Sequence, residues 1–489
     1  MINNINYLPF QSIVKGTYGR KIAYTDVSMI TPDNVVSVVG SCLSTFYFNR
    51  KAIEYLWNYY KGNQPVLYRT KANSARDDIV NHVVENHSYE IVQFKTSQTY
   101  GEPVQFISRK DDDVINDAVD KLNDYMTDVD KHAKDICSGE WQSATGTSFK
   151  AIQKVENQEI PFRIIVPSPL DTFIIYSRET GEPMLSVEML KDDDGEYKRC
   201  FSNNMEFYIR NSKVISYQLH GFGDIPIVEY PNNWERLSDI ELVITILDSI
   251  NSYQSDRVDA VDQFVHSWIK FVNCEIDEET FKKMKMMGAL VVKSNNGNDA
   301  KADVEVMSQE LNQSQTQIAK DDLWDNALSI LAIPNKQTNT GGDTAGAVAL
   351  RNGWDFSKNR AKLKDPIVKA SEKKLAKLVL NRLRIAKKEL GMSFRDFDVQ
   401  INHSPTDNMI VKTQSLQYLL QCGIHPAIAI ATIGLFSDPE KVYINSQPYL
   451  KALWKTVDDV EIENQLKDAQ DLLEQYQKNL VNEPAATLS

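Results

Sequence analysis

The sequence predicts an α+β protein that is mainly helical and has several domains. Its 489 residues, 42% of them hydrophobic and 25% charged, are typical of a globular chain with two to four domains of roughly 100–200 residues. Short β-rich runs separated by turn residues are concentrated between residues 150 and 230. Apolar residues at helical spacing dominate the segments that follow, and helices are also expected before them.

The N-terminal segment is expected to form helices. An aromatic run at residues 46–60 ends at Lys61-Gly62-Asn63-Gln64-Pro65, which is a helix stop. Residues 75–100 predict a short helix and a strand at residues 89–94. Asp111, Asp112 and Asp113 open a further helix, because aspartate favours the first turn.

The β-rich region predicts an antiparallel domain. Its turns contain proline, glycine and aspartate runs such as Asp192-Asp-Asp-Gly195. The predicted strands are 162–166, 171–176, 185–189, 206–209 and 214–219.

A long helix is expected after the β-rich region. Ser238 and Glu241 have capping-box spacing, and apolar residues recur in steps of three and four as far as Trp268. The helix therefore covers about 238–270, or roughly 50 Å. Gln254 and Arg257 interrupt its apolar stripe, and we interpret them as candidates for hydrogen bonding between subunits.

A small mixed insert and a second helix come next. Residues 271–310 contain β-rich runs, a short helix with Met284, Met286 and Met287, and a turn at Asn295-Asn-Gly297. A helix at about 312–332 ends before Pro334, so the two long helices are expected to form an antiparallel pair. The methionines fit either a partner surface or a core.

The last third of the chain begins with a polar loop at Pro334–Asp343 and continues as helices. Pro366 either kinks one long helix or begins a second one, with Asp365 as its cap. Helical segments dominate beyond Gly391.

The charge distribution is uneven. The chain has 67 acidic and 54 basic residues, a formal net charge of -13, which argues against binding DNA over its whole surface. Residues 344–391 nevertheless contain thirteen basic residues and only four acidic ones. These lysines and arginines either face acidic neighbours in the fold or in a second subunit, or form a surface that faces phosphates.

Enzymatic and metal-binding motifs are not recognisable. Gly341-Gly-Asp-Thr344 lacks the spacing and the lysine of a phosphate loop, and no GxSxG motif occurs. His82 and His87 lack the spacing of a zinc-binding helix, and the aspartate runs lack that of a calcium loop. The sequence therefore predicts no catalytic residues, no metal and no cofactor.

The cysteines and the hydropathy indicate a chain without disulfides or membrane spans. Cysteine occurs at five scattered positions with no CxxC pair, and no apolar stretch approaches the ~20 residues that cross a bilayer. The N-terminus lacks the features of a signal peptide. We expect a reducing compartment and no membrane.

The segment Gly223-Asp-Ile-Pro-Ile-Val-Glu-Tyr-Pro-Asn-Asn-Trp-Glu-Arg-Leu-Ser-Asp-Ile-Glu241 carries a family resemblance. It resembles the junction between the β-domain and the first stem helix in portal (head-to-tail connector) proteins of tailed double-stranded DNA bacteriophages with long noncontractile tails. The order of parts agrees over nearly the whole chain, from Tyr60-Lys-Gly62 to the loop before Ala345-Gly-Ala-Val-Ala-Leu350.

The resemblance implies a ring, usually of twelve subunits, at one capsid vertex, through which DNA enters and leaves. Its parts are called wing, stem, clip, tunnel loop and crown. They would correspond to 1–235 (wing), 236–270 (stem helix 1), 271–309 (clip), 310–333 (stem helix 2), 334–345 (tunnel loop), 346–391 (a long kinked basic helix of the wing) and 392–489 (crown).

The resemblance also implies partners and site residues. Partners would be other copies of the chain, double-stranded DNA passing through without sequence specificity, terminase, head-completion or adaptor proteins, and major capsid and scaffolding proteins. The expected location is the virion, after synthesis in the host cytoplasm. The alternatives are a terminase-like packaging enzyme and a capsid or scaffolding component. Candidate residues are Asn335, Lys336, Gln337, Thr338, Asn339, Thr340, Gly341, Gly342 and Asp343 in the tunnel loop, Asp248, Asp256, Asp259, Asp262, Lys358 and Lys362 along the channel, and Gln254 and Arg257 between subunits.

Overall fold

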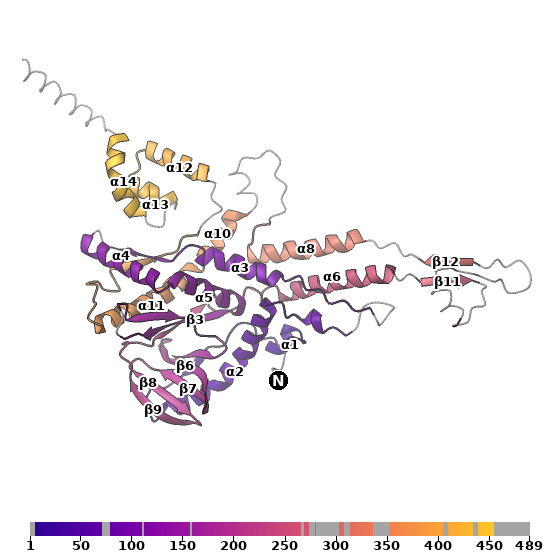
Figure 1. Cartoon of the computed structure of the whole chain (residues 1–489), viewed down its shortest axis with the longest axis horizontal. Coiled ribbons are helices and arrows are strands. Elements are labelled where there is room, and N and C mark those ends of the chain that lie inside the picture. The colour runs from indigo at the N-terminus through magenta and orange to yellow at the C-terminus, as the bar shows by residue number, and fades with distance from the viewer. Residues whose placement is uncertain are drawn as a thin grey trace, which may run out of the picture. The chain divides into compact units, whose positions relative to one another are not determined.

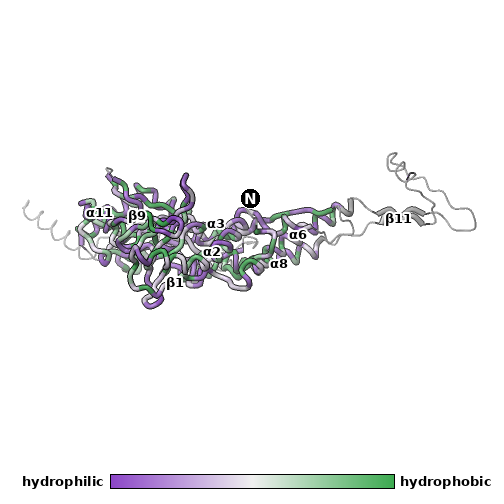
Figure 2. The backbone as a smooth tube through the Cα atoms, turned by 90° about the horizontal axis from the view of Figure 1, so that it is seen from below, coloured by the Kyte–Doolittle hydropathy of each residue, from purple (hydrophilic) through white to green (hydrophobic). Residues whose placement is uncertain are grey.

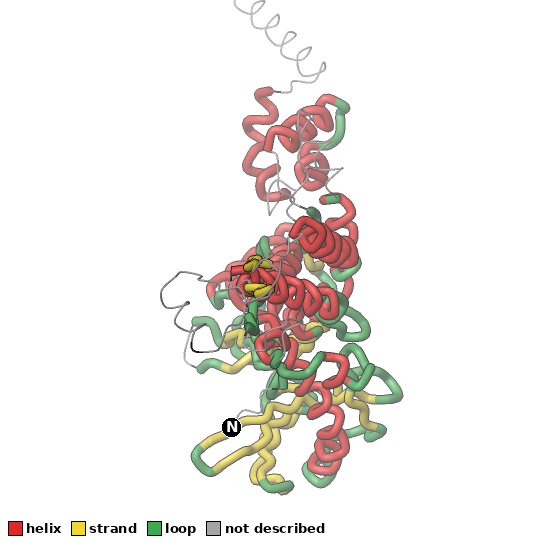
Figure 3. The backbone as a smooth tube through the Cα atoms, turned by 90° about the vertical axis from the view of Figure 1, so that its right-hand side faces the viewer, coloured by secondary structure: helices red, strands yellow, loops and turns green. Residues whose placement is uncertain are grey.

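The computed structural model divides the chain into two compact units, Met1–Pro405 and Thr406–Ser489. Helices and strands both occur in the first unit, and the second is helical where it is described (Figure 3). The described residues are 5–70, 79–109, 112–156, 159–265, 268–272, 279, 303–307, 313–335, 353–403, 409–433 and 439–453.

The N-terminal part of the first unit is helical, as predicted. Helix α2 (Val35–Tyr60) ends two residues before Gly62, whose φ of 90° is a conformation that glycine adopts without strain. Asp112 caps α4 (Asp113–Asp128) by accepting a hydrogen bond from the Val114 amide at 2.9 Å. The other helices of this part are α1 (Phe10–Val14), the short 3₁₀ helix η1 (Pro65–Tyr68), α3 (His87–Tyr100) and α5 (Lys131–Thr145).

The strand predicted at residues 89–94 is wrong, because these residues lie inside α3. The buried positions of α3 include Ser88, Ile91, Val92, Thr96 and Thr99, which recur at helical spacing. Packing against α2 and α5 therefore overrides the preference of isoleucine and valine for strands.

A six-stranded sheet forms most of the predicted β-domain. Its strand order is β1-β5-β6-β7-β8-β9, and all neighbours are antiparallel except the parallel pair β1 and β5. Helix α2 covers one face, where Phe46 stacks on Phe173. The strands are β1 (Ala23–Thr25), β5 (Thr172–Ser177), β6 (Pro183–Asp192), β7 (Gly195–Phe201), β8 (Met205–Arg210) and β9 (Lys213–Leu219).

A second sheet has three antiparallel strands in the order β10-β3-β4. They are β10 (Ile227–Pro231), β3 (Thr147–Lys154) and β4 (Phe162–Ile165). The sequence had not indicated β3 or β7. Lys150 explains why β3 escapes a hydropathy pattern, since this charged residue is fully buried in the middle of the strand.

Lys150 belongs to a buried cluster of four charges that joins β3, α5 and α11 (Asp365–Ile385). Its ammonium group pairs with Asp135 and lies 2.8 Å from Glu372 Oε1, and Lys131 lies 3.0 Å from Glu372 Oε2. Burial by itself would raise the pKa of Glu372, but the two lysines outweigh this effect and hold that pKa well below its ordinary value. The cluster is neutral overall and fastens α11 to the three-stranded sheet.

The predicted pair of long helices is confirmed. Helices α6 (Ile244–Val265) and α8 (Gln313–Leu331) lie side by side in two perpendicular views (Figures 1 and 2). Between them in sequence, β11 (Trp268–Val272) pairs antiparallel with β12 (Asp303–Met307). The predicted helix at 238–270 is shorter at both ends, because residues 239–243 form turns and Trp268 begins a strand.

The predicted long basic helix is interrupted. Its described part consists of α10 (Trp354–Lys362) and α11, and Pro366 occupies the first turn of α11. Proline therefore begins a second helix here, which was one of the two expectations. The expectation that Asp365 caps this helix is wrong, because Lys364 occupies the N-cap position without a side-chain cap and Asp365 lies in the first helical turn. A small sheet of β13 (Phe397–Gln400) and β2 (Gln105–Ser108) packs beside α11.

The second unit contains α12 (Met409–Gln421), α13 (Pro426–Ile433) and α14 (Pro439–Leu453). Its helical character agrees with the expectation for residues beyond Gly391. Within the described part of the chain, no helix combines the length and apolar character needed to cross a membrane.

Candidate functional site

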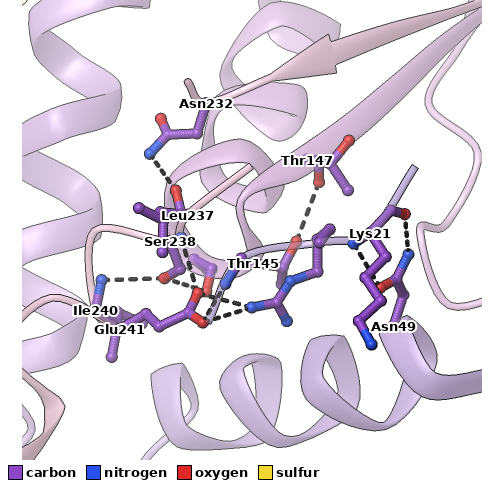
Figure 4. A network of polar contacts seen from close by, with 12 residues as sticks. Lys21, Asn49, Thr145, Thr147, Asn232, Leu237, Ser238, Ile240 and Glu241 are labelled. Carbon is purple, nitrogen blue, oxygen red and sulfur yellow. Dashed lines mark hydrogen bonds and ion pairs between the residues drawn. The ribbon is translucent and has the colours of Figure 1, made fainter. Parts of the chain in front are cut away.

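The junction before α6 is anchored by a buried network (Figure 4). The Ser238 amide donates to Glu241 Oε2 at 3.2 Å, and the Ile240 amide donates to Ser238 Oγ at 3.0 Å, so the predicted capping contacts are present. Glu241 also accepts hydrogen bonds from the Gly19 amide at 2.8 Å and from Arg20 at 2.7 Å. Because Glu241 serves the N-terminal segment as well, the turn at 238–241 is held in the body of the first unit.

Two glycines allow this junction to pass close to the backbone. A Cβ atom on Gly19 would lie 2.3 Å from the carbonyl oxygen of Glu235. A Cβ atom on Gly146 would lie 2.0 Å from the carbonyl oxygen of Arg236, and both distances are too short for a side chain to fit. Both glycines have φ above +70°, which is unfavourable for other residues. The position of the first turn before α6 therefore depends on glycine at both places.

The subunit-contact candidates lie between α6 and α8 of the same chain. Arg257 donates to Gln317 Oε1 at 2.6 Å, and Lys320 lies 3.5 Å from Gln254 Oε1. The polar interruption of the apolar stripe therefore has partners within the chain. A contact of Gln254 or Arg257 with another subunit stays a prediction.

The first channel candidate, Asp248, points toward α2. It accepts a hydrogen bond from Tyr59 Oη at 2.8 Å. Burial raises the pKa of Asp248 to about 6, although the Tyr59 hydrogen bond opposes this shift.

The other three aspartates of α6 bind residues from the segment between η1 and α3. Arg69 pairs with Asp256 at 2.6 Å and with Asp259, and the Asn81 side chain donates to Asp259 at 2.9 Å and to Asp262 at 2.8 Å. Asp259 is only 2% exposed. The structure thus brings these three residues together on one face of α6, where their described partners belong to the same chain.

The two lysine candidates of α10 differ in exposure. Lys362 is exposed, whereas Lys358 is half-buried and has an interaction partner. Whether any of the candidate residues lines a channel stays a prediction.

The basic residues of α11 mostly have partners within the fold. Lys373 pairs with Asp398 at 2.8 Å and Lys377 with Asp224 at 2.9 Å, while Lys374 lies 3.8 Å from Glu182. Arg382 is buried and donates to the Pro161 carbonyl at 3.0 Å. For these residues, the interpretation that the basic side chains face neighbours in the fold is confirmed.

The tunnel-loop candidates lie outside the described residues, with the exception of Asn335. Its side-chain amide donates to Asp325 Oδ1 of α8 at 2.8 Å. The methionines of the predicted clip also lie outside the described residues.

Sequence reasoning missed Arg20, Arg69 and Asn81. Each contacts α6 or the turn before it from more than 170 residues away in the sequence. A lone arginine or asparagine in an irregular segment has no spacing pattern, so no local signal identifies its partner. Among the described residues, no group of three or more histidine, cysteine, aspartate or glutamate side chains has the arrangement of a metal site.

Residues 48–425 match the family described as "Phage portal protein, SPP1 Gp6-like". The chain belongs to this phage portal family. The match covers more than half of the chain and includes both stem-type helices, the junction and the described strands other than β1. No curated relative matches the chain.

The solved structures that this portal protein resembles include chains from gene transfer agent particles. The neck of an empty GTA particle, computed with C6 symmetry, has a TM-score of 0.47 and 11% identity over 71% of this chain and 90% of that chain. The neck of a native GTA particle, computed with C12 symmetry, has a TM-score of 0.45 and 12% identity over 71% and 89%. The virion of a native gene transfer agent has a TM-score of 0.45 and 12% identity over 78% and 93%.

The family match confirms the predicted function, that of a structural portal protein in a phage-type virion. The predicted α+β, mainly helical fold class is confirmed as well. The alternatives of a packaging enzyme and of a capsid or scaffolding component are not favoured.

Proposed function

We propose that this portal protein assembles into a closed ring, of about twelve subunits, and that double-stranded DNA passes through the ring without sequence-specific contacts. The observation that carries the proposal is the unit of α6, the antiparallel strand pair β11–β12 and α8. One end of the helix pair is packed in the core of the body, and the paired strands lie between the two helices in the sequence. Such a unit suits a stem that stands beside copies of itself.

Charge supports weak contacts with DNA. A subunit with a net charge of -13 repels phosphates on average, which favours movement of the cargo over binding. Among the channel candidates only Asp259 is buried in the single chain, and Asp248, although partly exposed, is hydrogen-bonded to Tyr59 of α2. Asp256, Asp262, Lys358 and Lys362 also keep some exposure. We infer that these four, together with Lys336 and the rest of the tunnel loop 335–343, are nearest to DNA, and that Asp248 and Asp259 contribute only through their charge.

The parts of the subunit are proposed to have separate partners. Residues 271–309 would bind terminase and later head-completion or adaptor proteins, and residues 392–489 would form the crown inside the capsid. Residues 1–235 and the helices within 346–391 would form the wing, beside major capsid and scaffolding proteins. The role is structural and not enzymatic, in the virion, with synthesis in the host cytoplasm.

Microscopy of the purified full-length protein tests the ring. Negative-stain images are expected to show particles with a central hole, and native mass spectrometry is expected to give one dominant oligomer of about twelve copies. A population of monomers that hydrolyses ATP would contradict the proposal and favour the packaging enzyme.

A pair of variants tests the subunit contact at Arg257. Arg257→Ala and Gln317→Ala both remove the hydrogen bond between α6 and α8. If Arg257 also contacts a neighbouring subunit, only Arg257→Ala shifts the native mass spectrum toward smaller oligomers. Equal spectra for the two variants would remove Arg257 from the subunit interface.

A further inference from the structure

Residues 79–86, which belong to no helix or strand, lie along α6, and we call this segment the strap. Its backbone amides at Asn81, Val83 and Glu85 donate hydrogen bonds to α6 side chains. The acceptors are Asp259 Oδ1 at 2.7 Å, Ser255 Oγ at 3.0 Å and Asn251 Oδ1 at 2.8 Å, respectively. Every second residue of the strap is thus paired with every fourth residue of the helix, in the antiparallel direction.

The two repeats match in length. Two residues of extended chain advance about 6.6 Å, and four residues of α-helix advance about 6.0 Å. A regular ladder of this kind therefore continues over three hydrogen bonds, which are two steps of the repeat, with little distortion. A shift of the strap by one residue would turn its bonded amides to the opposite side, because alternate residues of an extended chain point in opposite directions.

The helix side of the ladder is buried. Asn251 and Ser255 have no exposed surface, and Asp259 is 2% exposed. Buried polar groups need hydrogen-bond partners, and the strap backbone supplies one to each of them. Departure of the strap would leave all three groups without these bonds.

Further contacts tie the strap to η1 and α8. The Arg69 side chain donates to the Asn81 carbonyl at 3.0 Å while it pairs with Asp256 and Asp259, and His82 Nδ1 lies 2.9 Å from the Val66 carbonyl oxygen. Near the other end, Glu85 pairs with Lys320 of α8 at 2.8 Å. The strap is therefore fastened to both stem-type helices and to the segment that follows α2.

We propose that the strap is a register lock for α6. Side chains of α6 bind the backbone amides of the strap. Because every second strap residue pairs with every fourth helix residue, this pattern fixes both the axial position and the rotation of α6 relative to the N-terminal body. Asp259 acts in this lock as an acceptor for the strap, and Asp256 and Asp262 hold Arg69 and Asn81 in place. The lock concerns a single subunit and does not depend on whether the chain forms a ring.

Hydrogen exchange of the full-length protein, read at single residues, tests the ladder. The amides of Asn81, Val83 and Glu85 are expected to exchange at least about tenfold more slowly than those of Val80, His82 and Val84. Ser255→Ala is expected to abolish the protection at Val83. Ser252→Ala is the matched control, since this exposed serine of α6 bonds only to the Asp248 carbonyl of its own helix. Equal exchange rates along the strap in the unchanged protein would overturn the proposal.

A pair of proline variants tests backbone recognition and the effect on α6. Val83→Pro removes a bonded amide, whereas Val84→Pro places the same residue at a neighbouring position of the extended chain. Val83→Pro is expected to speed the exchange of α6 amides between residues 251 and 262 by about tenfold or more, with a much smaller effect of Val84→Pro. An equal response to both prolines would overturn the lock. Native mass spectra of the same samples report ring formation separately.

Discussion

At the scale of single residues, the protonation of Asp248 makes the stability of the fold depend on pH. Burial beside α2 raises the pKa of this carboxyl to about 6, from an ordinary value of 3.8. A pKa that is raised in the folded state stabilises the fold fully below the unfolded pKa and loses this stabilisation as the pH rises through the folded pKa. The window in which Asp248 matters is therefore between about pH 4 and pH 6.

We expect Asp248→Asn to raise the melting temperature at pH 8 but not at pH 4. Asparagine keeps an oxygen acceptor for Tyr59 and carries no charge, so the gain at pH 8 is at most about 3 kcal/mol. Thermal unfolding at both pH values measures this, with the exposed Asp322→Asn as control. A melting temperature that is unchanged at pH 8 would show that Asp248 is solvated in the folded protein.

Glycine has opposite roles at two positions of the first unit. Gly146 has a φ of +90° and faces the Arg236 carbonyl. Gly40 lies in a middle turn of α2 at a solvent-exposed position, and a Cβ atom added there would meet no other atom within 4 Å. Gly146→Ala is expected to destabilise the protein by more than ~1 kcal/mol, whereas Gly40→Ala is expected to stabilise it by about 0.5–1 kcal/mol. Denaturant titration of both variants checks the signs, and a neutral Gly146→Ala would mean that the junction can move away.

At the scale of elements, the buried charges show how α11 is held. Glu372 on α11 meets Lys131 of α5 and Lys150 of β3, and none of the three is more than 3% exposed. Lysines buried in this way are stabilised only while carboxylates balance them. This explains how a helix that is rich in basic residues packs against a sheet that contains a buried lysine.

Glu372→Gln is expected to cost about 3–5 kcal/mol, because it leaves two buried ammonium groups with one carboxylate. Glu389→Gln, at an exposed position just beyond α11, is the control and should change little. Chemical unfolding at neutral pH measures both. A loss below about 1 kcal/mol would mean that water or another group compensates the lysines.

Element boundaries show where local patterns succeed. The stop before Gly62 and the helix start at the aspartate run 111–113 were predicted, and the restart at Pro366 was one of two alternatives, because each depends on the backbone preferences of a few residues. The strand predicted at 89–94 failed because its apolar residues are buried at helical spacing against other helices.

At the scale of the whole molecule, the first unit has extensive hydrophobic cores of its own. Among the described residues, the four core clusters lie between residues 5 and 401, within the first unit, which ends at Pro405. The first unit therefore contains the apolar packing that it needs to fold.

A chain truncated after Pro405 is expected to fold. The circular dichroism spectrum per residue and the cooperative thermal unfolding of the truncated chain should remain close to those of the full-length protein. The two proteins are measured in the same buffer. Aggregation of the truncated chain, or loss of cooperativity, would show that residues 406–489 stabilise the first unit.

The sequence by itself determined the fold class, the family and the pair of long helices, because turn residues, helical spacing and the junction at 223–241 are local features of the chain. It also named the aspartates of α6 as candidate residues. Only the tertiary structure decided what these residues contact. Arg69 and Asn81 reach Asp256, Asp259 and Asp262 across more than 170 positions, and Lys150 meets Glu372 across 222. Pairings of this kind depend on how the elements pack in three dimensions, and no periodicity along the chain records them.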